Sequence, residues 1–161
     1  MNTFSEYRIL VVNGPNLRFT GVRDSRIYGS RKIADIPDVL QEKNKNLLSR
    51  INLEFFQANG EGEIIDRLEK AWQEGIAGIV INPGAYTHTS LALADCLGWL
   101  NIAFVEVHLS NIWGRDQIRH HSLTAGHSIG VVAGFGIMSY IYGLQALVDF
   151  LDTRNNLLED K

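Results

Sequence analysis

The sequence has little of several features that would mark a particular class of protein. Its 161 residues include one cysteine, Cys96, so the chain cannot form an internal disulfide. Cys96 lies in an apolar stretch, where we expect a buried thiol without a chemical role. The formal net charge is only −3, which gives no basic field for nucleic acid. No apolar run approaches the roughly 20 residues that span a bilayer.

The first residues also lack a basic region followed by a long apolar run, which is the pattern of a secretory signal. Together with the single cysteine, this favours a cytosolic (cytoplasmic) protein in a reducing compartment. The hydrophobic content of 45% is ordinary, and 161 residues suffice for one domain with a real core. A small anionic ligand would need a local cluster of donors, because the global charge does not attract it.

Short apolar runs alternate with helical patterns along the chain. Their β-branched residues predict five strands, at residues 8–13, 51–57, 77–82, 103–108 and 128–133. Apolar residues at helical spacing predict helices at residues 63–74, 90–100 and 139–151. A further helix is expected at residues 35–49, with Asp35 as its cap. A polar tail follows from about residue 153, and we expect residues 155–161 to fray.

This alternation is typical of an α/β fold, a parallel sheet with helices on both faces. Five strands suit the flavodoxin-like, doubly wound order 2-1-3-4-5, in which ligands bind outside the carboxyl ends of the strands. The polar residues that follow the strands should then form the site. They lie at residues 13–16, 59–61, 82–88 and 106–111.

A long segment without periodicity follows the first predicted strand. Residues 17–32 carry several arginines and one phenol, Tyr28. A loop of this length between a strand and a helix is unusual unless it is functional. We interpret it as an active-site lid that bears cations, and a solvated basic loop is the alternative.

The third predicted strand ends at Asn82, and the Pro83-Gly84 turn follows it. Thr87 or Thr89 could cap the next helix. His88 then lies near the positive end of that helix, which disfavours an imidazolium and favours a neutral, hydrogen-bonding ring.

Glu106 and His108 are two residues apart on the fourth predicted strand, so their side chains point to the same face. A carboxylate beside an imidazole raises its basicity and prepares a general acid, although a purely structural pair is the alternative. Leu109-Ser110 offers backbone N–H groups and a hydroxyl to an anion. Arg115 and Arg119 are spaced to face the same ligand.

The sequence gives poor support to two other kinds of active site, a metal site and a Schiff-base lysine. Four histidines invite a metal site, but their spacing fits no HExxH or CxxC pattern, and adjacent histidines cannot both point one way. These histidines are His88, His108, His120 and His121. All five lysines lie in polar stretches, which do not favour the neutral amine that forms a Schiff base.

Several sequence blocks, in one order, resemble the type II 3-dehydroquinase family. The blocks are NGPNL at residues 13–17, GxR…YG at 21–29, FFQ-N-EGE at 55–63, INPGAYTHTS at 81–90, EVHLSNI at 106–112, R…RHHS at 115–122 and GFG at 134–136. The resemblance extends from about residue 9 to residue 147. Each block alone is weak evidence, whereas the ordered set is highly specific.

The resemblance implies a hydro-lyase, a 3-dehydroquinate dehydratase of the shikimate pathway or of quinate breakdown. Its reaction is an anti elimination of water to 3-dehydroshikimate through an enolate, with no metal or other cofactor. It also implies a flavodoxin-like fold and a homododecamer built from trimers.

The resemblance also assigns roles by position. Tyr28 would be the base that removes a proton alpha to the ketone, and Arg23 the cation that favours its tyrosinate. Asn16 would hold a water against the enolate oxygen. His108, supported by Glu106, would protonate the leaving hydroxyl. The implied substrate-binding residues are Asn82, Leu109 and Ser110 for the carboxylate, His88 and Arg119 for the ring hydroxyls, and Asp95 at a subunit contact near the neighbouring site.

The sequence departs from the family pattern at three places. Val22, Asp24 and Ser25 change the lid, Gly60 replaces a common histidine, and Trp113-Gly114 replaces a His-Ala pair. Since none of these removes a residue with an implied chemical role, we expect an active enzyme.

Other functions stay open from the residues alone. A flavin-binding module needs a Ser/Thr/Gly phosphate loop, where this chain has residues 15–17 (PNL). A receiver module needs an aspartate at the position of Asn82. A third alternative is an enzyme that acts on a related cyclic polyol acid.

Overall fold

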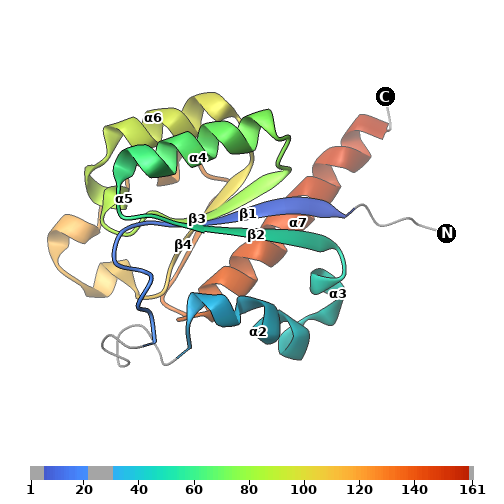
Figure 1. Ribbon diagram of the computed structural model, residues 1–161, viewed down its shortest axis with the longest axis horizontal. Coiled ribbons are helices and arrows are strands. Elements are labelled where there is room, and N and C mark those ends of the chain that lie inside the picture. Colours follow the sequence, from blue (N-terminus) through green and yellow to red (C-terminus); the bar gives the residue numbers. More distant parts are fainter. Residues whose placement is uncertain (1–5, 22–30, 160–161) are drawn as a thin grey trace.

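The computed structural model of the chain describes residues 6–21 and 31–159, which form one parallel sheet covered by helices on both faces (Figure 1). The five strands have the order β2-β1-β3-β4-β5. The flavodoxin-like, doubly wound α/β fold predicted from the sequence is therefore confirmed.

The strands lie within two residues of their predicted positions. They are β1 (Tyr7–Asn13), β2 (Ile51–Gln57), β3 (Gly78–Asn82), β4 (Phe104–His108) and β5 (Gly130–Ala133). The central strands β3 and β4 are buried along their whole length, whereas β5 is an edge strand.

Helices α4 (Glu61–Gln73) and α6 (Leu91–Leu100) cover one face of the sheet, and α2 (Ile36–Lys43), α3 (Lys45–Leu48) and α7 (Met138–Glu159) lie on the other (Figure 1). The remaining elements are short: η1 (Ile33–Asp35), α5 (Tyr86–Thr89), η2 (Ile112–Gly114), η3 (Gln117–Arg119) and η4 (Ala125–His127).

Alternation along β1 shows how the sequence builds the two layers. Ile9 and Val11 belong to the apolar cluster that packs with α2 and α7, and Leu10 and Val12 belong to the cluster with α4 and α6. Successive side chains of a strand point to opposite faces, so one apolar run supplies both cores. By the same rule, Glu106 and His108 of β4 point to one common face.

The helix predicted at residues 35–49 is wrong in its continuity. It breaks at Asn44, whose backbone leaves the helical region (φ −153°, ψ 73°) and whose side chain accepts the N–H of Leu47 to begin α3. Asp35 does not cap α2 through its side chain. Its carboxylate accepts the N–H of Lys32 and so stabilises η1 instead.

The tail predicted from about residue 153 is helical as far as Glu159, where α7 ends, and residues 160–161 lie outside the described residues. Asn155 donates a hydrogen bond to the Tyr7 hydroxyl, which in turn donates to Asp152. This contact with β1 holds the last turns of the helix on the sheet. Within residues 6–21 and 31–159, no helix is both long and apolar enough to cross a membrane.

Candidate active site

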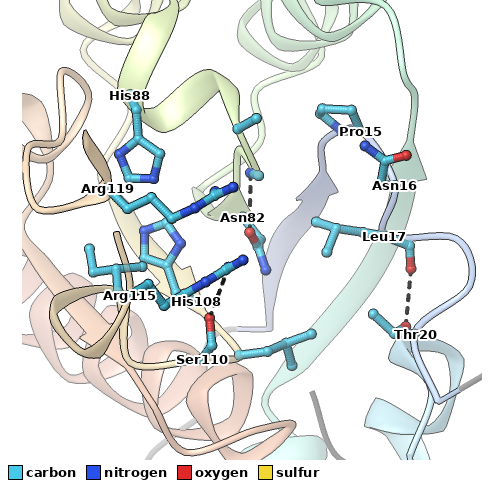
Figure 2. A pocket seen from close by; sticks show the side chains of 14 residues that line it. Pro15, Asn16, Leu17, Thr20, Asn82, His88, His108, Ser110, Arg115 and Arg119 are labelled. Atoms are coloured by element: carbon cyan, nitrogen blue, oxygen red, sulfur yellow. Dashed lines mark hydrogen bonds between the residues drawn. The ribbon is translucent and has the colours of Figure 1, made fainter. Parts of the chain in front are cut away.

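A cavity of about 180 Å³ lies at the carboxyl ends of the strands, as expected for this topology. The loop after β1 forms one side, and the segments after β3 and β4 form the other (Figure 2). Its small volume favours a compact ligand. The cavity is lined by Pro15, Asn16, Leu17, Thr20, Asn82, Gly84, Ala85, His88, His108, Leu109, Ser110, Ile112, Arg115 and Arg119.

Two glycines bring the loops after β1 and β3 into close contact. Gly14 donates its N–H to the carbonyl of Asn82 over 2.8 Å, and a Cβ at Gly14 would lie 2.2 Å from the carbonyl oxygen of Pro83. Gly84 adopts a left-handed backbone (φ +62°) beside Pro15. This approach fixes the position of Asn16 relative to β3.

Asn16 itself has a left-handed backbone (φ 66°), which is uncommon for a residue other than glycine. Its N–H donates to the side chain of Asn59, 3.0 Å away. The Asn59 carbonyl accepts the hydroxyl of Tyr86. Asn59 therefore supports the site from behind, whereas residues 59–61 were predicted to form it and do not line the cavity.

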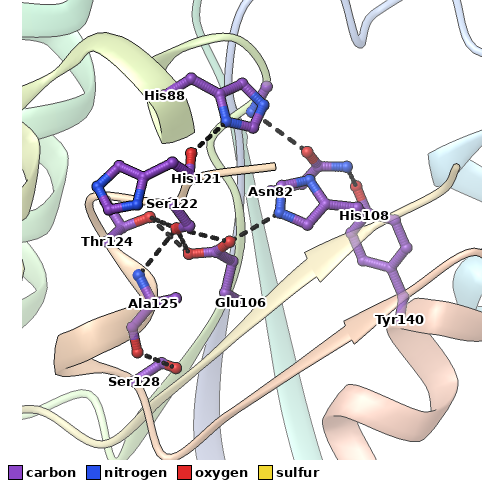
Figure 3. Close-up of polar contacts among 11 residues, drawn as sticks. Asn82, His88, Glu106, His108, His121, Ser122, Thr124, Ala125, Ser128 and Tyr140 are labelled. Atoms are coloured by element: carbon purple, nitrogen blue, oxygen red, sulfur yellow. Dashed lines mark hydrogen bonds and ion pairs between the residues drawn. The ribbon is translucent and has the colours of Figure 1, made fainter. Parts of the chain in front are cut away.

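Asn82 is held by a buried phenol on α7. Its Nδ2 donates to the Tyr140 hydroxyl over 3.0 Å (Figure 3). That hydroxyl donates to Oδ1 of Asn13. Oδ1 of Asn82 accepts the N–H of Gly84. Burial raises the pKa of Tyr140 above its ordinary range, so the phenol stays neutral. With these bonds made, Asn82 keeps one N–H for the cavity.

His88 lies on α5 with its ring nearly parallel to that of His108, 6.5 Å between centroids. Its Nδ1 is 2.7 Å from the carbonyl oxygen of His121, which only accepts, so Nδ1 carries the hydrogen. Burial lowers the pKa of His88, and the charges of His108 and Arg119 lower it further. The sequence placed His88 near the positive end of a helix, whereas it lies in the last turn of α5, and burial is the main cause of its lowered pKa. Thr87 and Thr89 do not cap α6, because Ser90 accepts the N–H of Leu93 instead.

The predicted pairing of Glu106 with His108 is present. Nε2 of His108 lies 2.8 Å from Oε1 of Glu106, and both residues are buried (Figure 3). Burial by itself would raise the pKa of Glu106, but hydrogen bonds from His108, Thr124 and Ser122 outweigh it and hold the pKa below its usual range. An ionised carboxylate only accepts, so Nε2 donates to it and Nδ1 is the nitrogen left for the cavity.

Two arginines border the cavity from the segment after β4. Nη1 of Arg115 lies 3.5 Å from the Ser110 hydroxyl. Nε of Arg119 is buried and has no hydrogen-bond partner among the described residues. A guanidinium presents several donors in a fixed plane, which suits the oxygens of a small polyhydroxylated acid. Leu109 is anchored beside them, since its carbonyl accepts the N–H of Gly136.

The structure thus brings most of the predicted site residues to one cavity. Glu106 does not line it but stands behind His108. Asp95 is exposed on α6 and does not border the cavity. Arg23 and Tyr28 lie outside the described residues, together with Val22, Asp24 and Ser25 of the predicted lid.

Sequence reasoning missed four residues that hold the site. Tyr140 appeared as one apolar position of a helix, and Ser122 as part of a motif without a role. Thr20 and Thr124 carried no recognisable signal. Of the departures from the family pattern, Gly60 is the N-cap of α4, with its N–H bonded to the Glu63 side chain, and the Trp113 side chain is exposed.

Other reactive groups lie away from the cavity. The Cys96 thiol is buried, and burial raises its pKa to about 11. Lys32, Lys43, Lys45 and Lys70 are exposed and do not line the cavity. Nε2 of His120 is bonded to the carbonyl of Arg115. Among the described residues, no three His, Cys, Asp or Glu side chains lie together as they would around a metal ion.

Known proteins match both the sequence and the fold. The model of the dehydroquinase class II family matches residues 7–148. The 3-dehydroquinate dehydratase of Caldicellulosiruptor saccharolyticus is 48% identical over 144 residues, which cover 89% of this chain and 98% of that protein. The crystal structure of type II dehydroquinase from Butyrivibrio crossotus has a TM-score of 0.81 at 41% identity and covers 88% of this chain and 97% of its own.

A second crystal structure, type II dehydroquinase from Propionibacterium acnes, has a TM-score of 0.80 at 35% identity and covers 91% of this chain and 99% of its own. Since these matches extend over nearly the whole chain in sequence as well as in fold, the chain belongs to the class II dehydroquinase family.

Proposed function

We propose that this protein is a 3-dehydroquinate dehydratase, a hydro-lyase that removes water by anti elimination through an enolate to give 3-dehydroshikimate. The observation that carries the proposal is the buried Glu106–His108 pair, which turns Nδ1 of His108 toward a small cavity lined by donors. The same step serves the shikimate pathway and quinate breakdown.

His108 acts as the general acid. Glu106 accepts the hydrogen on Nε2 and stabilises the imidazolium, so the second proton, on Nδ1, can pass to the leaving hydroxyl. His88 stays neutral beside it, because burial lowers its pKa. The two stacked rings therefore have different roles: one donates a proton, and the other binds a hydroxyl of the substrate.

Asn16 stabilises the enolate by holding a water against its oxygen. A donor fixed before the reaction stabilises developing charge without reorganisation, and the left-handed backbone of Asn16, bonded to Asn59, provides such rigidity. Asn82 with Leu109 and Ser110 binds the carboxylate, and Arg119 binds a ring hydroxyl. Asp95 contributes from a neighbouring subunit.

The base is Tyr28, and Arg23 favours its ionised form. A phenol with an ordinary pKa near 10 is a poor base at neutral pH, so a nearby guanidinium is needed.

Tyr28→Phe should abolish turnover and leave the circular dichroism spectrum unchanged, and near wild-type turnover would remove Tyr28 from this role. Arg23→Ala should move the rising limb of the pH–rate profile to higher pH. An unmoved limb would make Arg23 structural.

The function is tested by the conjugated-enone absorbance that grows when the purified protein meets 3-dehydroquinate. We expect the rate to be insensitive to a chelator and to borohydride treatment, because neither a metal nor an imine takes part. Loss of activity with either reagent would overturn the mechanism. A parallel assay on other cyclic polyol acids separates this function from action on a related substrate, which should show at most a small fraction of the rate.

We also propose a cytoplasmic homododecamer built from trimers. Exposed apolar side chains on the edge strand β5 and beside it, at Ile129, Val131 and Phe135, support assembly, because an unpaired edge with apolar side chains tends to associate. Sedimentation as twelve chains would support the proposal, and a monomer at micromolar concentration would contradict it.

A further inference from the structure

The carboxylate of Glu106 has two hydroxyl partners in addition to His108. Oγ of Ser122 lies 3.0 Å from Oε1 and 2.9 Å from Oε2, and Oγ1 of Thr124 lies 2.5 Å from Oε2. The N–H of Ala125 donates to Oγ of Ser122, which leaves the hydroxyl hydrogen to point at the carboxylate (Figure 3). Glu106 therefore accepts from three fixed donors inside the protein.

From this arrangement we propose that Ser122 and Thr124 are positioning residues of the general acid: their hydroxyls hold the Glu106 carboxylate in place, so that it keeps the hydrogen of His108 on Nε2 and leaves Nδ1 facing the cavity. The inference rests on the proposed function only in naming His108 as the acid. A buried carboxylate without such donors would be costly to ionise, and its protonation would remove the negative charge behind His108.

The segment that carries both hydroxyls is itself fixed to α5. The N–H of Leu123 donates to the carbonyl of Thr87 over 2.8 Å, and the carbonyl of His121 accepts Nδ1 of His88. Side chains two residues apart in this segment, Ser122 and Thr124, can then both point at Glu106. Because the backbone is held from the other side, the hydroxyls are positioned before a substrate arrives.

The charges around His108 make this support necessary. His88 faces it from α5, and Arg115 and Arg119 face the same cavity from the segment after β4. On the side of α7, the nearest titratable group is the Tyr140 phenol, which is neutral and is bonded to Asn82. The described residues that line the cavity include no carboxylate. Glu106 thus supplies the negative charge against cations that disfavour an imidazolium.

The test is the ring-nitrogen NMR spectrum of His108 in histidine-labelled protein at high pH, without substrate, which shows which nitrogen carries the hydrogen. Thr124→Val and Ser122→Ala should each give a mixture of the two tautomers, because a Glu106 carboxylate that can turn no longer holds the hydrogen on Nε2. Thr124→Ser restores the hydroxyl and should restore the single tautomer. Ser128→Ala is the matched control, since the Ser128 hydroxyl bonds the carbonyl of Ala125 and not Glu106.

Glu106→Gln sets the scale, because it removes the charged acceptor and should mix the tautomers at least as far. If Glu106→Gln mixes the tautomers, and Thr124→Val and Ser122→Ala keep the wild-type tautomer, the proposal is overturned. Turnover adds a second measure: kcat should fall about tenfold with KM changed less than about twofold. The NMR spectrum needs no substrate, so its outcome is separate from failure of the dehydratase assay.

Discussion

Replacement of Tyr140 by phenylalanine tests how the site is anchored to the core. The Tyr140 side chain is 0% exposed, and its hydroxyl both donates to Asn13 and accepts from Asn82. Tyr140→Phe keeps the ring and removes only the oxygen. Oδ1 of Asn13, which is also buried, would then lose its donor in a place that water does not reach.

The expected cost follows from that unsatisfied acceptor. A buried polar group left without its partner costs about 1–3 kcal/mol, and the lost bond from Asn82 adds to it, so we expect about 2–3 kcal/mol in total. For a domain of this length each kcal/mol lowers Tm by roughly 2–4 °C, which gives a drop of roughly 4–12 °C. Asn82 would also be free to turn, and KM for 3-dehydroquinate should rise several-fold.

The assay is thermal unfolding followed by circular dichroism at matched protein concentrations, with steady-state kinetics on the same samples. Tyr142→Phe is the control, because that side chain is 47% exposed and its ring packs edge-on against Phe135. It should melt within about 1 °C of wild type. A Tyr140→Phe protein that melts and binds like wild type would refute the anchoring role.

Three further predictions follow from the loops and the core. Gly14→Ala should inactivate the enzyme and cost more than about 2 kcal/mol of stability, because its Cβ would meet the Pro83 carbonyl oxygen at 2.2 Å. Gly62→Ala is the control in the same melting experiment. It has open space around it and should be neutral or stabilising. Ser90→Ala removes the cap of α6 and should lower the unfolding free energy in urea by about 1 kcal/mol, and an unchanged midpoint would argue against the cap. Cys96 should not react with a thiol reagent at pH 8 until the protein is unfolded, since its thiol is buried and has a pKa of about 11. Rapid labelling of the native protein would contradict this.

The sheet could be predicted from the sequence because its signal is local. Each strand is a short run of β-branched or aromatic residues bounded by turn residues, and all five lie within two residues of their expected places. The helix at residues 35–49 could not be predicted correctly, since its break depends on the Asn44 side chain, which bonds forward to Leu47. The end of α7 depends on a contact with Tyr7, 148 residues away in sequence.

In the site, too, local pairs could be predicted from the sequence, whereas contacts between distant residues could not. Glu106 and His108 could be paired from the sequence because two residues on a strand share a face. The partners of Glu106 on its other side are 16 and 18 residues away, and no spacing rule links Ser122 or Thr124 to it. The hydroxyl of Tyr140 meets its partners across 127 and 58 residues, so its helical position could only mark it as a core residue.

The central claim is an anti elimination of water from 3-dehydroquinate, and stereospecific labelling tests it most directly. Two substrates are prepared, each with deuterium in place of one of the two hydrogens of the methylene group alpha to the ketone. The product is examined by mass spectrometry. The account predicts loss of the deuterium anti to the leaving hydroxyl and retention of the other. Loss of the syn deuterium, or no 3-dehydroshikimate at all, would contradict it.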